Sequence, residues 1–276
     1  MAKTFLITGV SSGFGRALAE AVLSDGHTVA GTVRNDADKQ KFEALGRGAH
    51  ALLLDVTNTK AIAPAVADVE SGIGAIDVLV NNAGYGHEGI LEESSIDDLR
   101  RQFEVNVFGA VAMIQAVLPY MRRRRAGNIL NITSMGGIMT LPGLSYYHGS
   151  KFALEGISES LGKEVKDLGI KVTAVEPGGF RTDWAGRSMV RAGRSIKDYD
   201  SIIEPIRKRR MELSGWQIGD PKKAARAMLK VALSVDPPAH LLLGSDAVRL
   251  ASFCRETPAF VLRRAISSMK LGRTDA

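Results

Sequence analysis

The sequence contains a single cysteine, Cys254, so the chain cannot close an internal disulfide. A lone thiol is typical of proteins from a reducing compartment, and the apolar stretch Phe5–Ile7 near the N-terminus is too short for a secretory signal. We therefore expect a cytoplasmic protein. One cysteine cannot build a zinc cluster, and no two of the five histidines stand four residues apart, so the sequence predicts no metal site.

Long hydrophobic runs are also missing. No stretch approaches the ~20 apolar residues that a membrane-spanning helix needs, so we expect no membrane span. Aromatic residues make up only 6% of the chain, and none interleaves with the basic clusters Arg122–Arg125 and Arg207–Arg210, as binding of single-stranded nucleic acid would require. The net charge of +6 is therefore interpreted as solvated helix ends and attraction to an anionic small molecule. Binding of nucleic acid or of an acidic membrane surface stays open as an alternative.

Short apolar runs alternate with longer amphipathic stretches along the chain. The short runs are almost continuously apolar, as expected for strands that are covered on both faces. This alternation predicts an α/β protein with a Rossmann-type, doubly wound parallel sheet of about seven strands and helices on both faces. The expected strands are Thr4–Thr8, Thr28–Val33, Ala51–Leu54, Val78–Val80, Asn128–Ser134, Lys171–Val175 and Leu241–Leu243. The expected helices are Gly15–Ser24, Ala61–Ser71, Ile96–Met121, Tyr147–Leu168 and Pro221–Ser234.

No linker and no shift in composition divides the chain, so residues 1–276 are expected to form a single domain. Residues from about 181 to 218 interrupt the alternation, because they contain no clean strand and are rich in glycine. Ligands of open α/β sheets bind beyond the carboxyl ends of the strands. This segment follows the sixth strand and is therefore predicted to be a substrate lid, with an ordinary surface loop as the alternative. Residues from about 245 to 276 are predicted to form a helical C-terminal extension.

A glycine-rich loop, TGVSSGFG at 8–15, joins the first expected strand to the first helix. Glycine permits a tight turn and lets backbone N–H groups approach a phosphate, which the positive N-terminal end of the helix attracts. The spacing Gly-x-x-x-Gly-x-Gly differs from the Gly-x-Gly-x-x-Gly fingerprint, but its position after a strand still predicts a dinucleotide site. The residues expected to bind the cofactor here are Gly9, Ser11, Ser12, Gly13, Phe14 and Gly15.

The residue that ends the second strand indicates the coenzyme. Arg34 stands there, and a guanidinium pairs with a phosphate but cannot accept a hydrogen bond from a ribose hydroxyl, which favours NADP(H) over NAD. Asp36 is the nearby acidic residue that would instead favour NAD. Asp55, after the third strand, is expected to accept from the adenine amino group or to cap the next helix. Asn82 and Ala83, after the fourth strand, are expected to border the adenosine ribose.

Tyr147 and Lys151 are four residues apart and so share one face of a helix. The pKa of a free tyrosine is near 10, and a cation ~4 Å away stabilises the phenolate by about 4 kcal/mol at an effective dielectric of ~20. The pair therefore predicts general acid–base catalysis by Tyr147. Ser134 ends a strand and is expected to donate to a substrate oxygen. Asn106, unfavourable inside a helix, indicates a kink or a bound water. A surface helix pair, a turn serine and a solvated asparagine are the simpler alternatives.

Taken together, these motifs resemble the short-chain dehydrogenase/reductase family over residues from about 3 to 185. The resemblance depends on TGVSSGFG at 8–15, Asp55, NNAG at 81–84, Asn106, Ser134, YHGSK at 147–151, and Pro177 and Gly178 leading to Thr182. It departs from many NADP-dependent relatives at Ser12, where those proteins often carry a basic residue.

The resemblance implies that hydride moves to or from C4 of a nicotinamide while Tyr147 transfers a proton. It implies that Lys151 lowers the pKa of the tyrosine and holds the nicotinamide ribose. It assigns Ser134 to orienting the substrate and Asn106 to anchoring a water in a proton relay. The further cofactor contacts that it implies are Pro177, Gly178, Phe180 and Thr182. It also implies a homodimer or homotetramer.

Apolar residues between Ser134 and Tyr147 are expected to wall the substrate site, and their flexible methionines suit bulky lipophilic ligands. These residues are Met135, Ile138, Met139, Leu141 and Leu144, and simple packing in the core would explain some of them equally well. We therefore expect an NADP(H)-dependent oxidoreductase that acts on a lipophilic alcohol, ketone or aldehyde. A non-catalytic NAD(P)-binding regulatory protein and an NAD-dependent dehydrogenase of the same family are the alternatives.

Overall fold

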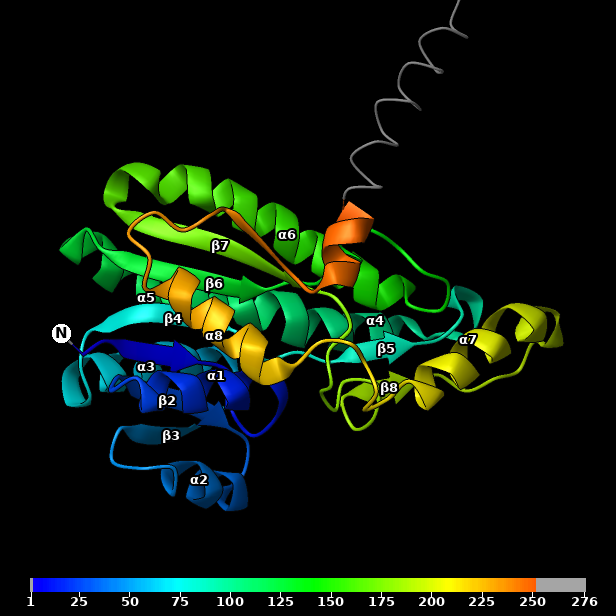
Figure 1. Cartoon of the computed structure of the whole chain (residues 1–276), viewed down its shortest axis with the longest axis horizontal. Coiled ribbons are helices and arrows are strands. Elements are labelled where there is room, and N and C mark those ends of the chain that lie inside the picture. The colour runs from blue at the N-terminus through cyan, green and yellow to red at the C-terminus, as the bar shows by residue number, and fades with distance from the viewer. Residues whose placement is uncertain (1, 252–276) are drawn as a thin grey trace, which may run out of the picture.

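A seven-stranded, fully parallel sheet forms the centre of the computed structural model, which describes residues 2–251 (Figure 1). Its order is β3-β2-β1-β4-β6-β7-β9, so the chain builds outward from β1 to one edge and then from β4 to the other. The strands are β1 Thr4–Ile7, β2 Thr28–Val33, β3 Ala49–Leu53, β4 Ile76–Asn81, β6 Gly127–Ile132, β7 Ile170–Pro177 and β9 His240–Leu243. This doubly wound order confirms the predicted fold class, and it creates a crevice beyond the carboxyl ends of β1 and β4.

Helices cover both faces of this sheet (Figure 1). One core lies under α1, α2 and α8, with Leu18 and Met228 among its buried side chains. A second core lies under α3, α5 and α6, with Met113 and Leu161 among its buried side chains. The helices are α1 Gly13–Ser24, α2 Asp36–Glu43, α3 Thr59–Gly72, α4 Ile96–Phe103, α5 Gly109–Arg124, α6 Ser145–Val165, α7 Asp200–Glu212 and α8 Pro221–Ala232.

Capping residues set several helix ends. Ser95 accepts from the backbone N–H of Asp98, whose carboxylate accepts in return from Ser95, which makes a capping box at the start of α4. The carboxylate of Asp220 caps α8 by accepting from the backbone N–H of Lys222, and Pro221 occupies the first turn. Gly26, just beyond α1, has a φ of 79°, the left-handed conformation that allows the chain to leave the helix towards β2.

Residues 181–218 differ from the prediction, because they contain regular structure. Strand β8 (Met189–Arg191) pairs in parallel with β5 (Gly86–Glu88) in a second, two-stranded sheet, and α7 follows. Strands of three residues are too short to show an apolar period, so neither of them could be recognised from its residues. The short helix α2 was not predicted for a similar reason, since Phe42 is its only buried residue.

Residues 96–124 form one helical stretch that is long and apolar enough, by length and composition alone, to cross a membrane. Met113, Val117 and Met121 on this stretch are buried against the sheet, which is the pattern of a core helix. The stretch is interrupted by a π-helical turn at Glu104–Phe108. Of the predicted C-terminal extension, residues 245–251 are helical, and the remainder lies outside the described residues, as does Cys254.

Candidate active site

The loop between β1 and α1 depends on its glycines. Gly9 and Gly13 have φ values of 72° and 59°, which favour glycine. A Cβ added at Gly15 would overlap the carbonyl oxygen of Gly9 and lie 2.5 Å from Nδ2 of Asn82. The loop therefore turns sharply and packs its own backbone against the chain that leaves β4.

Asn82 and Ala83 hold this loop in place. The hydroxyl of Thr8 accepts from the backbone N–H groups of both residues, each at 2.9 Å. Nδ2 of Asn82 donates to the carbonyls of Thr8 and Gly9, at 2.9 and 3.0 Å. Both residues thus brace the predicted phosphate loop from the neighbouring strand, whereas their contact with a ribose stays a prediction.

Two further predicted cofactor residues, Arg34 and Asp55, follow the carboxyl ends of β2 and β3. Arg34 is exposed at the end of β2, and Asp36 begins α2 two residues later. Asp55 follows β3 and accepts from the backbone N–H and the hydroxyl of Thr57, at 2.9 and 2.8 Å. Asn58, not Asp55, stands at the N-cap position of α3, so the helix-cap alternative for Asp55 is wrong.

The segment after β7 lies against the glycine loop. The ring of Phe180 packs edge-on against Phe14, with the ring centres 5.0 Å apart. A Cβ added at Gly13 would lie 3.9 Å from Thr182. The chain after Pro177 and the start of α1 therefore come together across the carboxyl ends of the strands.

An acidic residue that the sequence analysis did not single out fixes this segment. Oδ2 of Asp246 accepts from the backbone N–H of Gly179 at 2.6 Å. A Cβ at Gly178 would overlap the same carboxylate. Because Asp246 is about 67 residues from its partner in the chain, no local motif revealed the contact.

Ser134, Tyr147 and Lys151 come together at the end of β6, and all three are less than 10% exposed. Ser134 lies close enough to the phenol of Tyr147 to lower its pKa. Oγ of Ser134 also accepts from the backbone N–H of Gly136 at 2.9 Å, which fixes its position. Nζ of Lys151 lies 5.8 Å from the centre of the tyrosine ring and donates to the carbonyl of Ile132 at 2.8 Å.

The electrostatics of this group differ from the prediction. Burial raises the pKa of Tyr147 to about 12, and the nearby Ser134 only partly opposes that rise. Burial also lowers the pKa of Lys151 to about 8, opposed by the negative charge of Glu155. The predicted lowering of the tyrosine pKa by Lys151 is therefore not found, since desolvation determines the pKa of this buried phenol.

Asn106 lies in the π-helical turn between α4 and α5, where the sequence indicates an irregularity. Its Oδ1 accepts from the backbone N–H of Tyr85, and its Nδ2 donates to the carbonyl of Tyr85 and to Oγ of Ser150, all at 3.1 Å. A π turn often occurs at functional sites because it re-aims one side chain. Here it turns Asn106 inward, towards the helix that carries Tyr147.

The predicted lid supplies part of the wall around the tyrosine. The ring of Trp184 packs on Tyr147, with the ring centres 5.1 Å apart. Met189 and Leu144 complete an apolar cluster with these two rings. Of the predicted wall residues, Leu144 is buried in this cluster, whereas Leu141 is 43% exposed. The surroundings of the phenol are therefore mainly apolar.

Ion pairs tie residues 181–218, the predicted lid, to the chain near β5. The carboxylate of Glu88 is fully buried and pairs with Arg207 at 2.7 Å, with Arg191 at 3.3 Å, and with Arg210. Burial alone would raise the pKa of Glu88, but hydrogen bonds from Arg210 and Arg207 hold it below its usual value. The interpretation of Arg207–Arg210 as a solvated helix end is thus wrong for two of its four residues.

A second carboxylate, that of Glu93, binds residues 194–196 of the predicted lid. It pairs with Arg194 and accepts from the backbone N–H groups of Ser195 and Ile196, at 2.6 and 2.8 Å. Residues 191–210 are thus fixed at two points against a segment about 100 residues earlier in the chain.

Comparison with known protein families assigns this chain to one of them. The model of the family described as short chain dehydrogenase matches residues 3–190. The chain belongs to this family.

Curated relatives of this short-chain dehydrogenase match most of its length. It is 38% identical to oxidoreductase BOA17 of Botryotinia fuckeliana, over 93% of this chain and 94% of that one. It is 39% identical to 3-ketodihydrosphingosine reductase of Bacteroides thetaiotaomicron, over 88% of each chain. It is 36% identical to NADPH-dependent 3-dehydrocapnine reductase of Ornithobacterium rhinotracheale, over 71% of each chain.

Solved structures share the fold. A short-chain dehydrogenase from Streptomyces avermitilis superposes with a TM-score of 0.89 at 40% identity, covering 97% of each chain. A serine dehydrogenase complexed with NADP+ superposes with a TM-score of 0.75 at 26% identity, covering 87% of this chain and 94% of that one.

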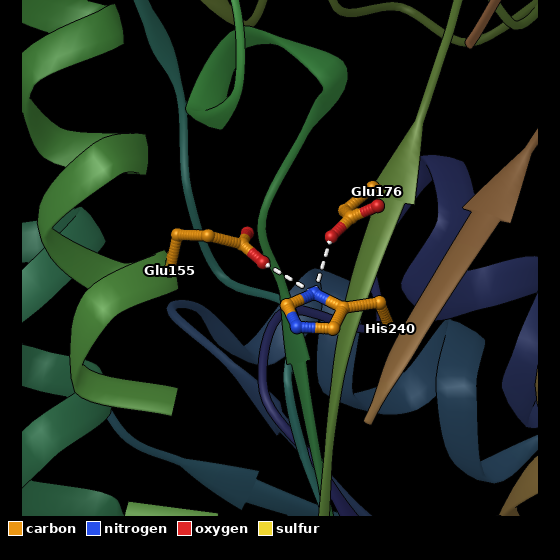
Figure 2. A group of neighbouring side chains, drawn as sticks. All are labelled: Glu155, Glu176 and His240. Carbon is orange, nitrogen blue, oxygen red and sulfur yellow. Dashed lines mark hydrogen bonds and ion pairs between the residues drawn. The ribbon is translucent and has the colours of Figure 1, made fainter. Parts of the chain in front are cut away.

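One group of side chains in this short-chain dehydrogenase was not predicted at all. Glu155, Glu176 and His240 bring their donor atoms within 4.8 Å of one another, a set that resembles metal ligands (Figure 2). The residues come from α6, β7 and β9, so spacing along the sequence could not reveal them. The prediction that the chain has no metal site therefore took no account of this cluster.

Proposed function

We propose that this short-chain dehydrogenase transfers hydride between NADP(H) and a lipophilic alcohol or the corresponding ketone or aldehyde, with Tyr147 as the acid–base. The observation that supports this function best is the convergence of buried Tyr147, Ser134 and Lys151 at the carboxyl edge of the sheet, beside the glycine loop. No other group of residues described in 2–251 combines a proton donor, a cation and a hydroxyl in this position.

The residues present fit a dinucleotide. The left-handed glycines Gly9 and Gly13 leave a cradle without side chains at the N-terminus of α1, where a pyrophosphate is attracted. Arg34, exposed at the end of β2, supports NADP(H), because a guanidinium binds the additional 2′-phosphate. Bound in this crevice, the nicotinamide supplies or accepts the hydride. The NADPH-dependent relative and the NADP+ complex support the same coenzyme.

Tyr147 is suited to donate a proton. With a pKa near 12 it is protonated at neutral pH, and carbonyl reduction requires a proton on the substrate oxygen as hydride arrives. Ser134 is placed to hold the same oxygen, since its hydroxyl lies near enough to the phenol to lower the pKa of Tyr147. Lys151 stabilises the phenolate that the proton transfer leaves behind, because its ammonium lies over the ring. A protonated phenol beside an ammonium therefore suits the reduction of a carbonyl compound.

The substrate class follows from the wall of the site. Trp184, Met189 and Leu144 surround Tyr147 with apolar surface, and this surface suits a lipophilic chain or ring. The names of two relatives, reductases of a keto and a dehydro compound, support a carbonyl substrate.

The test is a spectrophotometric screen at 340 nm with NADPH and NADH over aldehydes and ketones of graded size. We expect turnover of lipophilic carbonyl compounds and a ~100- to 10,000-fold loss of kcat in Tyr147→Phe. Tyr146→Phe is the matched control, because the hydroxyl of Tyr146 points instead to the carbonyl of Ser94, at 3.0 Å. A Tyr147→Phe protein with full turnover, folded and binding NADPH normally, refutes the assignment.

One observation favours a second candidate, an NAD-dependent dehydrogenase of the same family. Asp36 lies in the first turn of α2, only two residues after Arg34, and its carboxylate can accept from a ribose hydroxyl. A lower KM for NADH than for NADPH in the same screen supports this candidate. Binding of either coenzyme without turnover of any substrate supports the non-catalytic alternative.

We also propose that the protein forms a homodimer or homotetramer through its α5 and α6 faces. Phe108 and Phe152, which lie at the start of α5 and on α6, are 50% and 44% exposed. Light scattering of the purified protein tests this, and a monomer at micromolar concentration contradicts it.

A further inference from the structure

Two acidic residues of helix α6 continue the helix face that carries the proposed catalytic pair, Tyr147 and Lys151. Tyr147, Lys151, Glu155 and Glu159 are spaced by four residues and therefore share one helix face. Lys151 and Glu155 are 7% and 6% exposed. A buried carboxylate thus lies one helical turn from the buried ammonium of the proposed site.

The carboxylate of Glu155 is held by a histidine from the edge strand β9 (Figure 2). Nδ1 of His240 lies 3.0 Å from Oε1 of Glu155 and 2.7 Å from Oε1 of Glu176. Its Nε2 lies 3.5 Å from Glu159, which is half exposed. The ring nitrogen itself stands between the two buried carboxylates at hydrogen-bonding distance. The imidazole therefore occupies the place between the two carboxylates that a bound cation would need.

The four groups Lys151, Glu155, Glu176 and His240 have opposite charges that cancel when all are ionised. Two carboxylates face one ammonium and one imidazolium, and burial makes any uncompensated charge unfavourable. Burial and the carboxylate of Glu176 raise the pKa of Glu155 to about 7. Burial lowers the pKa of His240, but both carboxylates raise it more. A proton gained or lost by one of these four groups therefore changes the pKa values of the other groups.

Glu176 and His240 influence the charge of Lys151 through Glu155. Of the charged groups near Lys151, Glu155 is the one whose negative charge opposes the effect of burial on the ammonium. Glu155 is in turn faced by Glu159 on its own helix, by Glu176 on β7, by His240 on β9 and by the hydroxyl of Thr133 after β6. His240, with 36% of its side chain exposed, connects the set to solvent.

We propose that Glu155, held by His240 and Glu176, is a positioning residue that keeps Lys151 charged and thereby sets the upper pH limit of cofactor binding. This inference rests on the proposed function, because it takes Lys151 to hold the nicotinamide ribose. It assigns a role to three residues that lie outside the motifs singled out in the sequence.

The experiment measures NADPH affinity by fluorescence titration between pH 6 and pH 10. In the unchanged protein we expect affinity to fall as Lys151 loses its proton, with a midpoint near its pKa of about 8. Lys151→Met should abolish this pH dependence. Glu155→Gln keeps the shape of the side chain but removes its charge, and should move the midpoint down by about one pH unit.

Matched variants separate charge from structure. Glu155→Asp keeps the carboxylate and should move the midpoint less than Glu155→Gln does. Glu159→Gln removes a half-exposed carboxylate on the same face and should leave the midpoint within about 0.3 units. His240→Arg fixes a positive charge that keeps Glu155 ionised, whereas His240→Gln removes the charge that lowers the pKa of Glu155, so the midpoint of His240→Arg should lie above that of His240→Gln. This last pair alters a partly exposed side chain and keeps the proposal testable if Glu155→Gln does not fold.

The outcomes distinguish this inference from the proposed function. A midpoint in Glu155→Gln equal to that of the unchanged protein, together with equal midpoints for His240→Arg and His240→Gln, overturns the inference alone. If those midpoints shift as expected while Tyr147→Phe keeps full turnover, the catalytic assignment fails and the role of Glu155 stands. If the unchanged protein binds no NADPH, both are wrong.

Discussion

Replacing Gly15 by alanine tests the packing of the glycine loop between β1 and α1. Gly15 lies in the first turn of α1, and the added Cβ would overlap the Gly9 carbonyl oxygen and approach Nδ2 of Asn82 to 2.5 Å. Neither neighbour can move freely, because Nδ2 also donates to the carbonyls of Thr8 and Gly9. The loop must therefore shift by up to about 1 Å, which weakens both hydrogen bonds.

The expected destabilisation follows from these contacts. Overpacking costs about 1–3 kcal/mol, and two weakened hydrogen bonds add about 1 kcal/mol each, while alanine in a helix regains about 1 kcal/mol. The net loss is about 3 kcal/mol in the free energy of unfolding. For a chain of this size, that loss lowers Tm by about 6–12 °C. Displacement of the loop by about 1 Å should also weaken NADPH binding by roughly 100-fold.

The assays are a thermal melt without cofactor and a fluorescence titration with NADPH. Gly156→Ala is the control, because Gly156 lies within α6 and an added Cβ there meets no atom within 4 Å. Its Tm should rise by about 2–4 °C, with unchanged NADPH affinity. If Gly15→Ala melts with the unchanged protein and binds NADPH equally well, the steric argument for this loop is wrong.

Two further predictions concern the lid and the coenzyme. Glu88→Gln leaves Arg207 and Arg210 without their buried carboxylate and should cost about 3 kcal/mol, with faster proteolysis within residues 181–218. Arg210 and Arg207 hold the pKa of Glu88 in the folded protein below 4.5. The contribution of these ion pairs to the free energy of unfolding should therefore be complete above pH 4.5, and it should be lost as the pH falls through the pKa of Glu88 in the folded protein. Thermal melts of the unchanged protein and of Glu88→Gln between pH 3 and pH 6 measure this loss. Arg34→Asp should raise the KM for NADPH by roughly 10-fold or more and leave the KM for NADH unchanged or lower. Equal effects on both coenzymes would show that Arg34 does not contact the 2′-phosphate.

The main sheet and the order of its helices were predictable because their signals are local. A buried parallel strand is almost continuously apolar, and the turn after β1 needs glycine wherever it occurs. The spacing of Tyr147 and Lys151 likewise places both on one helix face without any knowledge of the fold.

The strand and the ion pairs of the predicted lid, residues 181–218, could not be foreseen because their partners are distant in sequence. Glu88 meets Arg207 and Arg210 across about 120 residues, and β5 and β8 are too short to carry a period. The prediction that Lys151 lowers the pKa of Tyr147 was wrong for a related reason. The sequence gives the spacing of the phenol and the ammonium, but not the burial that outweighs their attraction.

This burial connects the lid to the chemistry. Trp184 and Met189, both from the lid, contribute to the apolar cover that raises the pKa of Tyr147. The segment that follows them is held by Glu88 and Glu93. Loosening either carboxylate contact would hydrate the phenol and bring its pKa back towards 10, because desolvation is the main cause of its shift. The ion pairs of the lid and the acid strength of Tyr147 are therefore linked, although no charged residue of the lid touches the tyrosine in the contacts described for residues 2–251.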